Sequence, residues 1–214
     1  MKIHLLILIL LFTFSSNVYS KKKKNNKIEF IKPTPASLRI DDYKKRLELE
    51  TNSIVKNIHF RNIGPTVMSG RVVDFAVNPD DPTHFYVAYA SGGLWETKNH
   101  GNTFTPIFDN KIVMTLGDIA VDWKNEIIYA GTGENNSSRS SYSGVGIFKS
   151  SDNGKSWNHI GLDDSHHIGR IIIHPENPDI IWVAALGHLY SENEERGIFK
   201  SIDVYAIWHI HTVQ

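Results

Sequence analysis

Hydrophobic residues from position 70 onward fall in short runs of four to six, separated by polar turns. The runs are rich in valine, isoleucine, tyrosine, phenylalanine and tryptophan, and Asn-Pro, Asp-Pro, Gly-Gly or Asn-Gly pairs bound them. Short runs with such boundaries are typical of β-strands. No segment of this part keeps a 3.6-residue hydrophobic period, which argues against a helical repeat. The pattern therefore predicts an all-β fold.

The same pattern occurs three times along the chain. The copies begin at Gly70-Arg71, Gly117-Asp118 and Gly169-Arg170, so successive glycines are 47 and 52 residues apart. Repeats of this length are typical of β-propellers, in which four short antiparallel strands make one blade. We therefore predict a partial β-propeller of about three four-stranded antiparallel blades. Their approximate bounds are 70–110, 117–162 and 169–211.

A recurring octet follows each third strand. Its clearest copy, at 150–157, reads Ser-Ser-Asp-Asn-Gly-Lys-Ser-Trp and matches the Asp-box pattern Ser-x-Asp-x-Gly-x-Thr-Trp except at Ser156. The aspartate can accept backbone N–H groups of its own turn, the glycine can adopt a positive φ, and the tryptophan can cover apolar surface between blades. We expect these aspartates to be structural rather than catalytic. The residues assigned to the Asp-box turns are Ser150, Asp152, Gly154, Trp157, Asn99, Gly101, Phe104, Asp203 and Trp208.

The third octet, at 201–208, departs from the pattern. Tyr205 stands where the turn needs glycine, and a bulky residue at positive φ is strained. Two interpretations follow: a degenerate last blade, or a terminus altered by a frameshift or premature stop. Because the glycine is lost shortly before the chain ends, we favour the second and expect a truncated propeller.

The N-terminal part differs in character from the repeats. A basic residue, an apolar run at 5–14 and small residues before Ser20 form the pattern of a secretory signal peptide at 1–20, cleaved after Ser20. The run is shorter than the roughly 20 apolar residues that span a membrane. We therefore favour a secreted or periplasmic protein without stable membrane insertion over an uncleaved anchor. Residues 21–57 are predicted to form a basic, polar linker that can hold one short helix, and 58–214 the partial propeller.

Composition narrows the chemistry available to the chain. Twenty-three lysines and arginines balance 23 aspartates and glutamates, which argues against a chain-wide basic field for nucleic acid. Cysteine is absent, which excludes a disulfide framework, cysteine-bound zinc and a thiol nucleophile. We predict no metal site and no cofactor.

Several motifs together point to a known family. FRNIGP at 60–65, SGGLW at 91–95, GTGE at 131–134 and HHIGR at 166–170 resemble the exported Asp-box (BNR-repeat) β-propeller proteins of bacteria. These are similar to the N-terminal propeller of sortilin and often carry the label glycosyl hydrolase. Members are usually several times longer and form complete propellers. The resemblance thus implies that the chain corresponds to the first three blades and that further blades are its partners.

The hydrolase label can be tested against residues. The resemblance implies that an Asp-box xyloglucanase carries an aspartate just before a Gly-Gly pair, but this chain has Ala90-Ser91 there. Sialidases need three arginines and a tyrosine nucleophile; Arg71 and Arg170 begin equivalent strands, but the middle blade has Asp118. We therefore predict no catalytic residues. The favoured function is a non-catalytic module that binds protein, peptide or glycan, and the alternative is a fragment of a xyloglucanase-like or sialidase-like glycoside hydrolase.

Candidate binding residues lie where first strands begin and in the long loops after second strands. An Arg-Asp-Arg set could bind an anionic or polar ligand, although a salt-bridge ring between blades is the favoured interpretation. His166 and His167 point to opposite faces of an extended strand and cannot readily chelate one ion, so hydrogen-bonded structural histidines are favoured. The partner would be an extracellular protein, peptide or glycan, and not nucleic acid. The candidates are Arg71, Asp118, Glu134, His166, Arg170 and His188.

Overall fold

A computed structural model describes most of the chain. The described residues are 32–58, 70–136, 141–203 and 208–211. The chain divides into two compact units, 1–32 and 33–214, and all the helices and strands below belong to the second. The predicted signal peptide, the motif at 60–65 and Tyr205 lie outside the described residues.

The segment that sequence patterns assign to a linker contains a 17-residue helix, α2 (Ala36–Asn52). Leucine, lysine, arginine and glutamate dominate it, and all four favour helix. Pro35 precedes its first turn, where the missing N–H costs nothing. Ion pairs one turn apart, such as Lys45 with Asp42 at 3.0 Å, add a small stabilisation. No helix in the described part of the chain has both the length and the apolar composition needed to cross a membrane.

Twelve strands in the described residues form three separate antiparallel sheets of four strands each, in sequential order. The first sheet contains β1 (Val72–Val77), β2 (Phe85–Tyr89), β3 (Gly93–Thr97) and β4 (Thr105–Pro106). The second contains β5 (Leu116–Asp122), β6 (Ile127–Thr132), β7 (Ile147–Ser150) and β8 (Asn158–His159). The third contains β9 (Ile168–Ile173), β10 (Ile181–Ala185), β11 (Gly197–Ser201) and β12 (His209–His211). The predicted fold class is confirmed.

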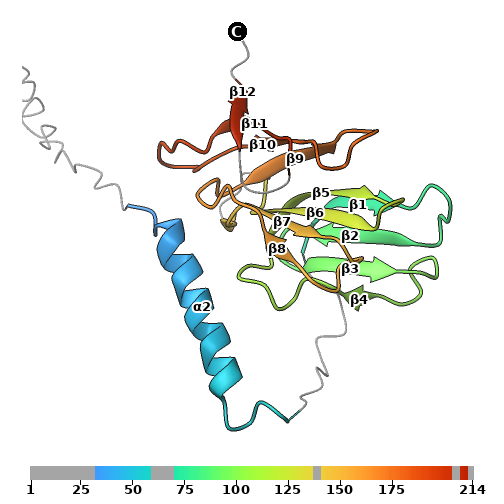
Figure 1. Ribbon diagram of the computed structural model, residues 1–214, viewed down its shortest axis with the longest axis horizontal. Helices are drawn as coiled ribbons and strands as arrows, with labels where there is room; N and C mark the ends of the chain where they lie inside the picture. The colour runs from blue at the N-terminus through green and yellow to red at the C-terminus, as the bar shows by residue number, and fades with distance from the viewer. Residues whose placement is uncertain (1–31, 59–69, 137–140, 204–207, 212–214) are drawn as a thin grey trace, which may run out of the picture. The chain divides into compact units, whose positions relative to one another are not determined.

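The middle sheet packs against both of the others. Its first strand, β5, lies against β1 of the first sheet and β9 of the third (Figure 1). Alternate residues of β6 therefore enter two cores: Ile128 and Ala130 pack with the first sheet, and Ile127 and Tyr129 pack with the third. Every residue of β6 is buried, which explains why its sequence is a continuous apolar run without polar alternation.

The octet at 150–157 forms a tight turn held by its own side chains. Asp152 accepts hydrogen bonds from the backbone N–H of Ser156 at 2.8 Å and from its hydroxyl at 2.6 Å. Gly154 has a φ of +82°, and its N–H donates to the Ser150 hydroxyl at 2.8 Å. Hydrogen bonds to the ionised form hold the pKa of Asp152 down at about 2, those from Ser156 contributing most. The carboxylate of Asp152 is therefore committed to the turn.

The tryptophan that ends an octet joins its blade to the previous one. The indole N–H of Trp157 donates to the backbone oxygen of Ile107 at 2.9 Å, and that of Trp208 donates to Ile160 at 2.8 Å. The first octet ends in Phe104, which has no N–H to donate and instead packs edge-on against Phe85 of its own sheet. The tryptophans thus act as inter-blade hydrogen-bond donors as well as apolar cover.

Candidate functional site

The antiparallel topology brings the predicted binding residues to one edge of the sheets. In each sheet the first strand begins opposite the end of the second, as the pairing of Val72 with Tyr89 illustrates. We call this edge, with the loops that leave it, the strand-start edge. Residues in or within three positions of these strand ends include Arg71, Asp118, Glu134, His166, Arg170 and His188.

The strand pairing shows that Arg71 is not equivalent to Asp118 and Arg170, although the sequence alignment placed all three at the start of the first strand. After a one-residue bulge, Asp118 pairs with Gly131 and Arg170 with Ala184. In the first sheet the residue at this place is Asp74, which pairs with Ala88; Arg71 lies three residues earlier, before β1. The sequence alignment was therefore wrong for Arg71 and missed Asp74. Counting back from the Asn-Pro turn at 78–79 would have found it.

Asp74 and Asp118 make the same contact between neighbouring blades. Asp74 Oδ2 accepts the backbone N–H of Ile119 at 3.2 Å, and Asp118 Oδ2 accepts that of Ile171 at 2.6 Å. Each carboxylate thus binds the first strand of the next blade. Burial raises the pKa of Asp118 to about 7, and the nearby Asp74 carboxylate adds to the rise, whereas the Ile171 N–H and Arg170 oppose it.

Two ion pairs cross between blades at the same edge. Arg71 pairs with Glu134, and Arg170 Nη1 lies 3.3 Å from Asp118 Oδ1. In both pairs the carboxylate is buried, at 2% and 3% exposed, while the arginine side chain is 54% and 65% exposed. The strand-start edge therefore presents guanidinium groups outward and keeps its partner carboxylates inside. Of the expected Arg-Asp-Arg salt-bridge ring, the structure contains the pair of Arg170 with Asp118, whereas Arg71 pairs with Glu134.

The segment after β6 is fixed tightly against the third sheet. Gly133 has a φ of +85°, and a side chain there would collide with the backbone oxygen of His166. The Asn135 amide donates to the backbone oxygen of Gly117 at 2.8 Å, which ties the residue after Glu134 to β5. In the GTGE sequence, Gly133 thus lets the backbone pass close to His166, and the carboxylate of Glu134 follows directly after it.

His166 and His188 lie together at the strand-start edge of the third sheet. His166 precedes β9 and His188 follows β10, and the hydrogen bond from Leu186 N–H to His167 oxygen extends the pairing between these segments. The two imidazole rings are 3.6 Å apart between centroids. Asp164 completes the group: its Oδ2 is 3.0 Å from His188 Nε2 and its Oδ1 is 3.8 Å from His166 Nε2.

The expectation that His166 and His167 are structural histidines with satisfied hydrogen bonds is wrong. Nε2 of His166, Nδ1 of His167 and Nε2 of His188 are all buried and have no hydrogen-bond partner. His188 Nε2 is close to Asp164 but at an angle that makes no hydrogen bond. Sequence reasoning compared His166 with its neighbour His167, whereas the ladder between β9 and β10 puts it beside His188.

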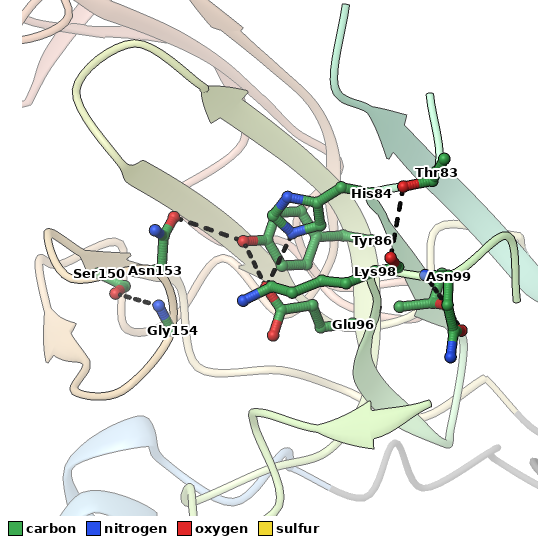
Figure 2. Close-up of polar contacts among 10 residues, drawn as sticks. Thr83, His84, Tyr86, Glu96, Lys98, Asn99, Ser150, Asn153 and Gly154 are labelled. Carbon is green, nitrogen blue, oxygen red and sulfur yellow. Dashed lines mark hydrogen bonds and ion pairs between the residues drawn. The ribbon is translucent and has the colours of Figure 1, made fainter. Parts of the chain in front are cut away.

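A second polar cluster, not found from sequence, lies among the side chains of β2 and β3 (Figure 2). Glu96 accepts from the Tyr86 hydroxyl at 3.2 Å, and its Oε1 is 2.8 Å from His84 Nε2. The Tyr86 hydroxyl also lies 3.4 Å from Asn153 in the octet of the next blade. A cavity of about 410 Å³ adjoins Glu96 and the octet glycine, Gly154. The cluster links the first blade to the second.

Comparisons with known proteins support the fold and leave the activity open. No protein-family model matches the chain, and no curated protein matches its sequence. An ancestral GH74 enzyme superposes with a TM-score of 0.54 at 20% identity, covering 69% of this chain and 19% of the enzyme. YCF48 from Cyanidioschyzon merolae gives 0.46 at 14% identity, over 70% of this chain and 39% of YCF48. PorZ, a type-IX secretion component of Porphyromonas gingivalis, gives 0.42 at 26% identity, over 60% of this chain and 17% of PorZ.

These similarities extend only to part of a β-propeller. The chain spans about a fifth of the length of the GH74 enzyme, and at 20% identity the likeness concerns the fold alone. The scores for YCF48 and PorZ are too low to support any inference. The structure is therefore a set of propeller-like blades with β-propeller proteins among its structural neighbours.

Proposed function

We propose that the protein is an exported, non-catalytic propeller module that binds an extracellular protein, peptide or glycan at the strand-start edge. The observation that carries the proposal is that, in both inter-blade ion pairs, the carboxylate is buried and the arginine is exposed. Their carboxylates are buried and joined to neighbouring blades, while Arg71 and Arg170 expose about half or more of their side chains. A guanidinium held by a buried carboxylate is already oriented and can donate its remaining N–H groups to a ligand.

Two exposed tyrosines lie in loops at the same edge as these arginines. Tyr142 precedes β7 and Tyr190 precedes β11, so both lie in loops that leave the strand-start edge, and they are 57% and 78% exposed. Exposed tyrosines combine an apolar ring with a hydroxyl and suit the faces of sugars or peptide side chains. Arginine and tyrosine together favour ligands that carry anionic groups.

The hydrolase alternative has less support from the same residues. A glycosidase needs one carboxyl group to protonate the leaving oxygen and another to act on the opposite face of the sugar. The raised pKa of Asp118 would suit an acid, but Asp118 is buried and its oxygens receive the Ile171 N–H and face Arg170. Glu134 is equally buried against Arg71.

Binding can be tested with a panel of acidic polysaccharides, neutral xyloglucan and acidic peptides, measured by biolayer interferometry. We expect an acidic probe to bind and the double variant R71Q/R170Q to weaken that binding at least tenfold. R46Q is the matched control, because Arg46 lies on α2, where it pairs with Glu50 and stacks over Tyr43 of the same helix. Equal binding by R71Q/R170Q and wild type, or no binding by any probe class, would contradict the proposal.

A further inference from the structure

We propose that Asp164, His166 and His188 form a binding site for one divalent first-row transition-metal ion, with Zn²⁺ as the probe. Among the described residues, this is the group whose ligand atoms come together: two imidazole nitrogens and a carboxylate oxygen, all within 4.8 Å of one another. The inference is independent of the proposed binding function.

The donor set has the right chemistry for such an ion. Imidazole nitrogen and carboxylate oxygen both bind zinc at about 2.0–2.2 Å, so neighbouring ligand atoms around one ion lie about 3–4 Å apart. The distances from Asp164 to His188 and His166, 3.0 and 3.8 Å, fall in this range. Two histidines and one carboxylate also leave coordination positions open for water or a ligand group.

Unused nitrogen atoms provide the second, independent observation. His188 is 4% exposed, and its Nε2 is buried, has no hydrogen-bond partner and lies 3.0 Å from Asp164 Oδ2. Nε2 of His166 is likewise buried without a partner. A buried polar atom without a partner is costly, and a shared metal ion would satisfy both nitrogens and the carboxylate at once.

The imidazole of His188 is also held in place from its other side. Its Nδ1 lies 2.6 Å from the Ser191 hydroxyl, and a hydrogen bond at this nitrogen orients the ring as it does around bound metals. His166 has a φ of +56°, unusual for a residue other than glycine, and its backbone oxygen accepts the Gly144 N–H at 2.6 Å. Both ligand side chains therefore start from fixed backbones.

The loops that carry the three ligands are tied to each other. Asn193 accepts the backbone N–H of His188 at 3.0 Å and donates to the backbone oxygen of Asp164 at 2.9 Å. Glu195 accepts the backbone N–H of Asp164 at 2.7 Å. These bonds use the backbone of Asp164 and leave its carboxylate free for the ion, and at 39% exposure that side chain offers a path for entry.

Charged side chains of both signs lie near the site. The positive charge of Arg39 opposes a cation in this region, but Asp163 and Asp164 both attract Arg39 and offset it.

The test is a titration of the full chain, stripped of metal with EDTA and dialysed, with Zn²⁺ in an isothermal calorimeter. We expect one Zn²⁺ per chain, and at least tenfold weaker binding in H188N and D164N. H188N keeps an atom near the position of Nδ1 for Ser191 and removes Nε2, and D164N keeps the backbone bonds of Asp164. Co²⁺ should give a visible d–d spectrum in the wild type that both variants lose.

The matched control is H209N, because His209 lies in β12 and is not part of the proposed ligand group. H209N should bind Zn²⁺ like the wild type. Circular dichroism of the metal-free variants shows whether each folds, and D164N decides the question if H188N does not. Absence of stoichiometric binding, wild-type affinity in D164N, or loss of binding in H209N alone would overturn the proposal.

Discussion

Several aspartate side chains in this protein accept hydrogen bonds from backbone N–H groups. Asp152 holds its own turn, while Asp74 and Asp118 each hold the first strand of the next blade. Their environments shift their acidity in opposite directions: hydrogen bonds lower the pKa of Asp152, and burial raises that of Asp118. Aspartate at these two positions therefore affects stability in opposite ways: ionisation of Asp152 stabilises the folded state, and ionisation of Asp118 destabilises it.

Replacing Asp152 with alanine should lower the free energy of unfolding by about 1–2 kcal/mol, because the turn loses its hydrogen bonds from Ser156 and Ser150. Since the pKa of Asp152 is lower in the folded state, its contribution is present above about pH 4 and is lost as pH falls toward 2. Urea denaturation at pH 7 and at pH 3 measures both effects. The control D80A removes a carboxylate that forms no hydrogen bond or ion pair with the described residues, and it should change stability little. Equal losses in the two variants would contradict the assignment.

Asp118 should make stability fall as pH rises from about 4 to 7. Its folded-state pKa is raised, so the folded protein binds this proton more tightly than the unfolded chain, and ionisation costs stability up to about pH 7. The low pKa values of His166 and His167 act the other way over the same range. The informative quantity is therefore the difference between wild type and D118N in urea denaturation from pH 4.5 to 8, which should decline by up to about 1.4 kcal/mol per pH unit. A constant difference would refute the assignment.

At the level of elements, the local sequence is enough to predict strands and turns. Which residues come together in the candidate site depends on how the strands pair. The octet at 150–157 was predictable because its hydrogen bonds join residues at most four positions apart. The equivalence of Asp74 with Asp118 was missed because the sequence alignment started from the leading glycines, and Asp74 lies four residues after Gly70 whereas Asp118 directly follows Gly117. The contact of His166 with His188 depends on the ladder between β9 and β10, and adjacent positions in the sequence gave no sign of it.

Trp157→Phe should destabilise the protein by about 1–2 kcal/mol, because the backbone oxygen of Ile107 loses its indole donor across the blade interface. Trp95→Phe is the matched control, since the Trp95 indole donates to Gly92 within its own blade. Chemical denaturation of the two variants compares them directly. A W157F variant as stable as the wild type would show that the inter-blade hydrogen bond contributes nothing.

At the scale of the whole molecule, the outer faces of the first and third sheets carry exposed apolar side chains. Val72 and Phe75 of β1 are 51% and 63% exposed, and Ile172 of β9 is 56% exposed. In the middle sheet, strand β6 is buried along its whole length between two cores. Faces of this kind are interaction surfaces in repeat proteins, because each blade buries its apolar side against a neighbour.

We predict concentration-dependent self-association, seen by sedimentation velocity, that Phe75→Ser and Ile172→Ser together reduce. Burying these faces against another copy would remove apolar surface from water. Leu49→Ser on α2, a residue 72% exposed, is the control for general loss of surface hydrophobicity and should leave association unchanged. A wild type that stays monomeric at all concentrations, or an effect of the control alone, would contradict this.

On the proposed non-catalytic function, the strand-start carboxylates Asp118 and Glu134 join blades and take no part in a reaction. The most direct measurement is release of reducing ends from a polysaccharide panel that includes xyloglucan, comparing the wild type with D118N and E134Q. We predict no release above a heat-inactivated sample for any of the three, together with a lower unfolding midpoint in both variants. Release of oligosaccharides by the wild type that D118N or E134Q abolishes, with the variants still folded, would contradict the account.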